Sequence, residues 1–72
     1  MTNKEKLNHL EELMDIEKDT LNEEIELASL GEWDSMAFIA TIAMFDSDFG
    51  KAVTSNEVKG FVTVKDIMDR ME

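Results

Sequence analysis

The chain has no cysteine and no proline, and only three glycines occur among its 72 residues. The lack of cysteine excludes disulfides, thiolate metal sites and a cysteine nucleophile. The lack of proline and the scarcity of glycine favour helices joined by polar loops. No apolar run is long enough to cross a bilayer, and the N-terminal residues lack the apolar core of a secretion signal. We therefore expect a cytoplasmic protein that is not embedded in a membrane.

Basic residues are also scarce, since seven Lys and Arg stand against seventeen Asp and Glu for a net charge of -10. Nucleic acids and anionic membranes both attract clustered Lys and Arg, so the composition excludes these partners and favours basic ones. Most of the charge lies between Glu11 and Asp34, where ten acids and one lysine give -9. Because 43% of the residues are hydrophobic, the chain is too apolar for a disordered acidic tail. It is predicted to be one small acidic globular domain, residues 1–72.

The first helix is predicted to start at Thr2 or Asn3, because Thr2 and Glu5 have the spacing of a capping box. Its apolar stripe recurs every three or four residues, as expected of a helix with one face on a core. The stripe consists of Leu7, Leu10, Leu13 and Met14.

A second helix is predicted from Ser35 to Phe49, with Asp34 as its N-cap and Gly50 in the left-handed position beyond its end. This segment is apolar nearly all the way round. It should therefore be the central helix, or present part of its surface to a partner.

Two shorter helices complete the expected fold. Thr54 and Glu57 predict the start of a third helix, which Gly60 ends, and Thr63 opens a last helix that reaches about Met71. Residues 15–33 are weakly periodic and are interpreted as a long loop, with at most one helical turn. The apolar residues that pin this loop are Leu21, Ile25, Leu27 and Leu30. The prediction is an all-α, four-helix fold with a long first loop and a short third helix.

Ser35 is the strongest candidate for chemistry. A serine in the first turn of a helix is accessible, and a phosphate on it would be stabilised by unpaired N–H groups and the helix dipole. Serine is common near helix starts for capping reasons alone, however, and on local grounds that explanation is the more frequent one.

The arrangement as a whole resembles the acyl carrier protein family. The family's mark is an Asp-Ser-Leu motif at the start of the second of four helices, and here it stands as Asp34-Ser35-Met36. The apolar helix through residues 45–50, the turn at residues 54–57 and residues 61–67 also match the family's layout. The resemblance covers essentially the whole chain and implies the family's four-helix bundle.

This resemblance implies a carrier and not an enzyme. A phosphopantetheinyl transferase would attach 4'-phosphopantetheine from coenzyme A to Ser35, and Asp34 would cap the helix and help the transferase bind. Acyl groups would then be held as thioesters and delivered to acyl-loading, synthase or acyltransferase enzymes with basic docking patches. The pathway would be fatty acid or a specialised lipid or secondary-metabolite synthesis, and the carrier would be monomeric.

The family also has an acyl cavity and a docking face. Plain core packing is the alternative for most of the cavity candidates, which are Leu27, Leu30, Ile39, Ile42, Phe45, Phe61, Ile67 and Met68. The candidate partner contacts are Met36, Phe38, Ala43, Asp46 and Asp48. The chain departs from the family at Met36, at the bulky Trp33, and at the start of the second helix, where the usual acids are replaced by Ala37, Phe38 and Ala40.

Other functions remain open from the residues alone. The segment Asp15–Glu26 mimics a calcium loop, although Thr20 occupies the sixth position, where the turn needs glycine. The same acidic segment could instead serve a protein-interaction module. An enzyme is disfavoured, because His9 is the single histidine, on a predicted polar face, and Ser35 lacks a Gly-x-Ser-x-Gly elbow. No metal site is predicted for the carrier itself.

Overall fold

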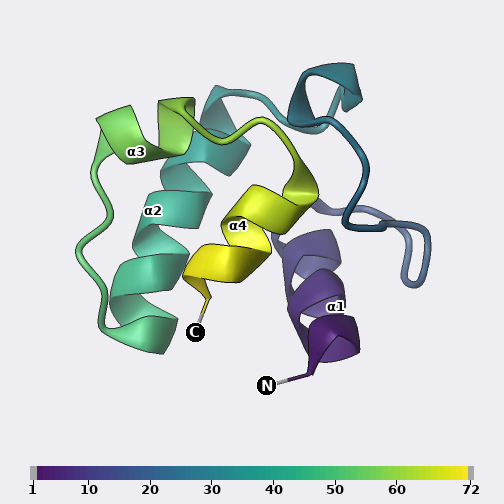
Figure 1. Ribbon diagram of the computed structural model, residues 1–72, viewed down its shortest axis with the longest axis horizontal. Helices are drawn as coiled ribbons and strands as arrows, with labels where there is room; N and C mark the ends of the chain where they lie inside the picture. Colours follow the sequence, from purple (N-terminus) through teal and green to yellow (C-terminus); the bar gives the residue numbers. More distant parts are fainter. Residues whose placement is uncertain (1, 72) are drawn as a thin grey trace.

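Helix α1 (Asn3–Met14) begins where its capping box predicts. The computed structural model describes residues 2–71 (Figure 1). The hydroxyl of Thr2 accepts the N–H of Glu5 at 3.1 Å, and the Glu5 carboxylate accepts the N–H of Thr2 at 2.9 Å. The helix ends at Asp15, whose φ of 57° is left-handed and turns the chain into the loop.

Helix α2 (Ser35–Phe49) has the predicted bounds and both predicted caps. The Asp34 carboxylate accepts the N–H of Ala37 at 3.0 Å. At the other end Gly50 has a φ of 62° and donates its N–H to the carbonyl of Phe45. Glycine adopts this left-handed conformation without steric cost, so it ends the helix cleanly.

The two shorter helices are α3 (Ser55–Lys59) and α4 (Val64–Arg70). Thr54 caps α3 through its hydroxyl, which accepts the N–H of Glu57 at 3.2 Å. The Asp66 carboxylate caps α4 by accepting the N–H groups of Val62 at 2.8 Å and Thr63 at 3.1 Å. The predicted short third helix is therefore confirmed.

The loop between α1 and α2 is ordered by backbone pairing and by buried apolar side chains. It contains one 3-10 turn, η1 (Leu27–Ser29), and buries Leu21 and Leu27. Its backbone pairs with the α3–α4 connection, since the N–H of Leu27 donates to Val62 at 2.8 Å and that of Val64 donates to Ile25 at 3.0 Å. The predicted pinned loop is confirmed, and its pairing with the start of α4 is an addition that the sequence pattern did not indicate.

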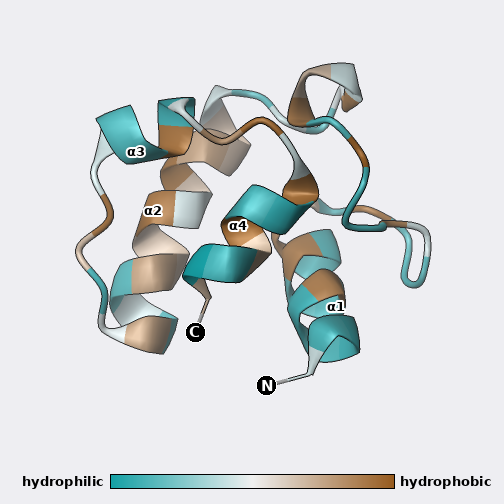
Figure 2. Cartoon of the chain, in the orientation of Figure 1, coloured by the Kyte–Doolittle hydropathy of each residue, from teal (hydrophilic) through white to brown (hydrophobic). Residues whose placement is uncertain are grey.

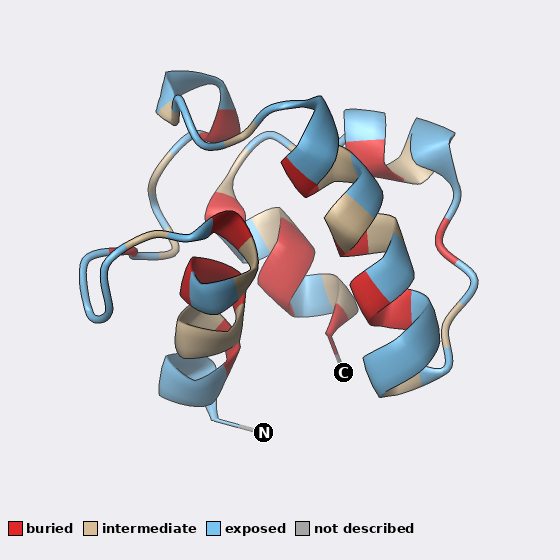
Figure 3. Ribbon diagram, turned by 180° about the vertical axis from the view of Figure 1, so that it is seen from behind, coloured by how far each residue is buried: buried red, intermediate tan, exposed pale blue. Residues whose placement is uncertain are grey.

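The core lies where α1, α2 and α4 face one another. Buried positions, red in Figure 3, lie on the facing sides of these helices, with Leu10, Phe45 and Ile67 each 0% exposed. Hydrophobic residues follow one another along much of α2, whereas in α1 and α4 they alternate with polar residues (Figure 2). α2 presents part of its apolar surface to the exterior, since Met36 is 78% and Ile39 66% exposed. The start of α1 and the end of α4 lie on the same side of the fold (Figure 1). Within residues 2–71 no helix has both the length and the apolarity needed to cross a membrane.

The Asp66 cap predicts a pH-dependent contribution to stability. Two backbone hydrogen bonds, the first and larger from the N–H of Val62 and the second from that of Thr63, hold the pKa of Asp66 below its usual value of 3.8. A carboxyl whose pKa is lowered in the fold stabilises it fully above its unfolded pKa and loses this effect as the pH falls through the folded one. Asp66→Ala should therefore cost about 1 kcal/mol near neutrality, and this cost should shrink as the pH falls below 3.8.

Urea unfolding of wild type and variant at neutral pH and at a series of pH values below 3.8 measures this change in cost. Asp69→Ala is the matched control, because Asp69 is an exposed aspartate on the same helix that pairs with Lys65 and caps no backbone N–H within residues 2–71. An Asp66→Ala cost that stays constant across the pH range would contradict the role of the charged cap.

Candidate functional site

Ser35 is exposed at the first residue of α2. Its hydroxyl makes no hydrogen bond to any other part of residues 2–71. The first bond of the helix ladder runs from the N–H of Phe38 to the carbonyl of Asp34 at 2.9 Å, so the N–H groups before Ala37 have no acceptor within the helix. These donors and the dipole make the surroundings of the hydroxyl favourable for a bound phosphate.

The segment that leads into Ser35 is held against α2 by aromatic packing. Trp33 is half-buried, and its backbone N–H donates to the carbonyl of Leu30 at 3.1 Å. The centroid of its ring lies 6.5 Å from that of the Phe38 ring. Phe38 is half-buried in this contact. The other four candidate partner contacts are exposed.

The other candidate partner contacts lie on the exposed surface of α2. Met36 is 78% exposed, and Ala43, Asp46 and Asp48 are exposed as well. The carboxylate of Asp48 pairs with the imidazole of His9, with Oδ2 and Nε2 2.9 Å apart. This pair connects α1 to α2 and gives His9 a partner 39 positions away, which the sequence did not predict.

The candidates for an acyl cavity fall into three groups. Leu27, Phe45, Ile67 and Met68 are packed in the core and at most 2% exposed. Leu30, Ile42 and Phe61 are half-buried, and Ile39 is 66% exposed on the outer side of α2. Because Ile39 is on the surface, it lines no interior space in this conformation.

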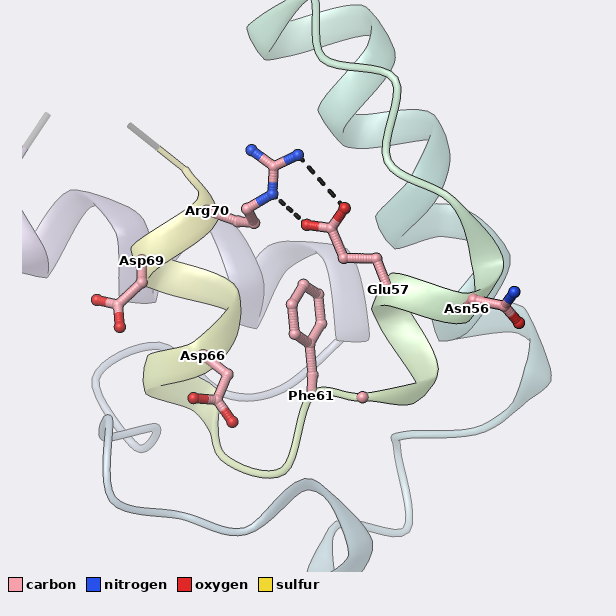
Figure 4. Close-up of a pocket in the computed structure, with 7 residues that line it drawn as sticks. Asn56, Glu57, Phe61, Asp66, Asp69 and Arg70 are labelled. Carbon is pink, nitrogen blue, oxygen red and sulfur yellow. Dashed lines mark hydrogen bonds and ion pairs between the residues drawn. The ribbon is translucent and has the colours of Figure 1, made fainter.

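Two open grooves are bordered by three of the four less buried candidates, Ile39, Ile42 and Phe61. Ile39 and Ile42 border one of about 430 Å³ between α2 and the α2–α3 loop. Phe61 borders another of about 450 Å³ between α3 and α4 (Figure 4). Ile42 and Phe61 therefore border two separate grooves.

An ion pair that the sequence analysis missed joins α3 to α4. Arg70 binds the Glu57 carboxylate through two nitrogens beside the ring of Phe61, as Figure 4 shows. The hydrogen bond from Arg70 lowers the pKa of Glu57, and the same bond raises the pKa of Arg70. Lys51 adds a bond of 2.8 Å from its ammonium group to the Arg70 carbonyl. These contacts hold α3, which is short, against the end of α4.

The structure gives no support to the calcium interpretation of Asp15–Glu26. Within residues 2–71 no group of three or more acidic or histidine side chains is arranged to hold a metal ion. The twelfth position, Glu26, has extended backbone paired with Thr63 and is followed only by the three-residue turn η1. A calcium loop of this type instead leads into a helix that orients the last carboxylate.

The fold and the site define a small carrier domain, in which an exposed serine without a hydrogen-bond partner in residues 2–71 lies at the start of α2. The family model described as "Phosphopantetheine attachment site" matches residues 7–71, nearly the whole chain, and the chain belongs to this family. No curated protein and no solved structure matches the chain significantly. The protein is therefore a carrier and not a catalyst, and its prosthetic group is 4'-phosphopantetheine.

Proposed function

We propose that Ser35 is the residue that carries the 4'-phosphopantetheine group. The observation that supports this most directly is the exposed, unbonded hydroxyl at the first residue of α2. The residues around it fit a phosphodiester, because unpaired backbone N–H groups and the positive helix end lie at the same place. When bound, the group supplies a thiol that holds acyl groups as thioesters, which the cysteine-free chain does not supply itself.

Asp34 has the positioning role in this proposal. Its carboxylate accepts the Ala37 N–H at 3.0 Å, which fixes the first turn and leaves the Ser35 hydroxyl directed away from the core. Because that carboxylate is already engaged, it holds the helix start in place without blocking the serine. This supports the role of Asp34 in presenting Ser35 to the transferase.

The carrier is proposed to act in the cytoplasm as a monomer formed by residues 1–72. It would receive acyl intermediates of fatty acid or of specialised lipid or secondary-metabolite synthesis, and deliver them to loading, synthase or acyltransferase enzymes. A flexible arm raises the effective concentration of its cargo at each enzyme. The proposed acyl contacts that have accessible surface are Leu30, Ile42 and Phe61. The proposed docking contacts on α2 are Met36, Ala43 and Asp46.

The test is to incubate the protein with coenzyme A and a phosphopantetheinyl transferase and to measure intact masses. Wild type should gain one phosphopantetheine, and fragmentation should locate it on Ser35. Ser35→Ala should gain none, while Ser47→Ala, a change of another exposed serine on α2, should load as wild type does. An unmodified wild type, or an adduct that persists in Ser35→Ala, would refute the assignment.

A further inference from the structure

Two adjoining grooves follow the seam between α1 and α2 and begin beside Ser35. The first, of about 670 Å³, includes Asp34 and Met36, the residues on either side of Ser35. The second, of about 390 Å³, continues toward the end of α2 and includes Ala43 and Met44. The two grooves share Leu13 and Ala40. We call them together the α1–α2 furrow.

The floor of the furrow is apolar and its rim is acidic. Leu13 and Ala40 lie in the floor, whereas the lining near Ser35 includes the exposed acids Asp15, Glu32 and Asp34. No ion pair within residues 2–71 involves Asp15 or Glu32, so no described cation neutralises these two carboxylates.

The far end of the furrow has the same character. Its lining includes Glu12 and Asp48, and its single basic residue is His9, which is already bound to Asp48 at 2.9 Å. The furrow therefore offers an apolar floor between carboxylates along its whole length.

The groove on the other side of α2 differs in charge. Its charged residues are one acid, Asp46, and one base, Lys51, and Ala43 borders both this groove and the furrow. Its apolar lining consists of Ile39, Ile42, Ala43, Ala52 and Val53. A basic partner gains little net attraction there, because Lys51 opposes it. Charge complementarity therefore selects the furrow for a basic partner.

We propose that a basic amphipathic helix of a partner enzyme docks in the α1–α2 furrow. An amphipathic helix lays apolar residues at spacings of three and four into a groove and directs its polar side chains to the rim. Here the apolar residues would lie on Leu13 and Ala40, and Lys or Arg side chains would meet Asp15 and Glu32. The 15 residues of α2 span about 22 Å, which matches roughly four turns of a partner helix. This inference rests on the proposed carrier function, since it names the partner surface used beside Ser35.

The experiment uses a synthetic helical peptide of about four turns with leucine on one face and lysine on the other. Titrated into isotope-labelled protein, it should shift the amide signals of Leu13, Glu32 and Ala40 and saturate. A scrambled peptide of the same composition keeps the charge but has no apolar face, so it should bind at least about tenfold more weakly. Equal binding of the two peptides, no saturation, or shifts centred on Ile42 and Val53 would overturn the proposal.

Matched variants locate the contact. Ala40→Gln adds a side chain to the furrow floor, and Ala52→Gln adds the same side chain to the opposite groove. The first should weaken the dissociation constant about tenfold, and the second by less than about twofold. Equal effects of the two would place the contact elsewhere.

A second pair of variants tests the rim without altering packing. Asp15→Asn with Glu32→Gln neutralises two exposed acids of the furrow, and Asn tolerates the left-handed backbone of Asp15. Glu24→Gln with Asp69→Asn removes two exposed acids that do not line it. Only the first pair should weaken binding about tenfold, and equal weakening by both would show attraction to net charge alone. Mass analysis of Ser35 loading is independent of this titration, so a failed proposed function and a failed furrow give different results.

Discussion

Glu11→Ala is expected to destabilise the domain by about 2–4 kcal/mol and to release the start of the α1–α2 loop. Glu11 is only 1% exposed, and its Oε2 atom accepts the N–H groups of Thr20 at 2.9 Å and Leu21 at 2.8 Å. Removing the carboxylate leaves the N–H groups of Thr20 and Leu21 without their acceptor. The hydrogen bond made by the Leu21 N–H is buried. Buried donors that lose a charged acceptor account for the size of the expected loss.

Glu11→Gln is the informative comparison. Its amide oxygen can accept from the same two N–H groups, and the change removes a buried negative charge. The other carboxylate oxygen, Oε1, is buried without a hydrogen-bond partner, so no described bond is lost on that side. We expect Glu11→Gln to stay within about 1 kcal/mol of wild type.

Urea unfolding measures both variants, and hydrogen exchange at the Leu21 amide reports the loop directly. Leu21 should exchange faster in Glu11→Ala than in Glu11→Gln. If the alanine variant were as stable as wild type and kept Leu21 protected, the carboxylate would not anchor the loop.

Phe45→Ala is expected to cost about 3–5 kcal/mol, because Phe45 is 0% exposed and among the largest fully buried side chains. A domain of 72 residues has a total stability of about 4–11 kcal/mol, so this change removes much of it. The cost comes from the lost apolar burial and from the cavity left between the helices.

Two variants separate core packing from loss of hydrophobicity in general. Phe45→Leu keeps most of the volume and should cost about 1 kcal/mol. Ile39→Ala removes a side chain from the same helix that is 66% exposed, and should change stability by less than about 0.5 kcal/mol. Thermal or urea unfolding gives all three values. A Phe45→Ala cost as small as that of Ile39→Ala would mean that Phe45 is not packed in the core.

The helix ends were predictable from the sequence because each depends on a local signal. Thr2, Asp34 and Thr54 each cap a helix through a neighbour three positions away, and Gly50 is a glycine where the backbone turns left-handed. Such signals involve only residues that are close in the sequence, and they do not depend on the rest of the fold. The position of Ser35 on α2 followed from them.

What the sequence could not provide came from contacts between distant residues. α2 is apolar nearly all round, so periodicity did not distinguish the buried Phe45 from the exposed Ile39. The pairing of His9 with Asp48 depends on how α1 lies on α2.

Glu11 was hidden among the surrounding acids, although one signal could have revealed it. It lies four residues after Leu7 and three before Met14, which places it on the inner face of the helix.

The pairing of the loop with the start of α4 has a consequence for the time at which the carrier becomes usable during its synthesis. Leu27 pairs with Val62, and Val62 is made 27 residues after Ser35. At about 5–20 residues per second, this delay is about 1–5 seconds on the ribosome. Through that interval the serine is present while the loop before it has no anchor at α4. A transferase that recognises the folded helix start should therefore load the finished domain and not the nascent chain.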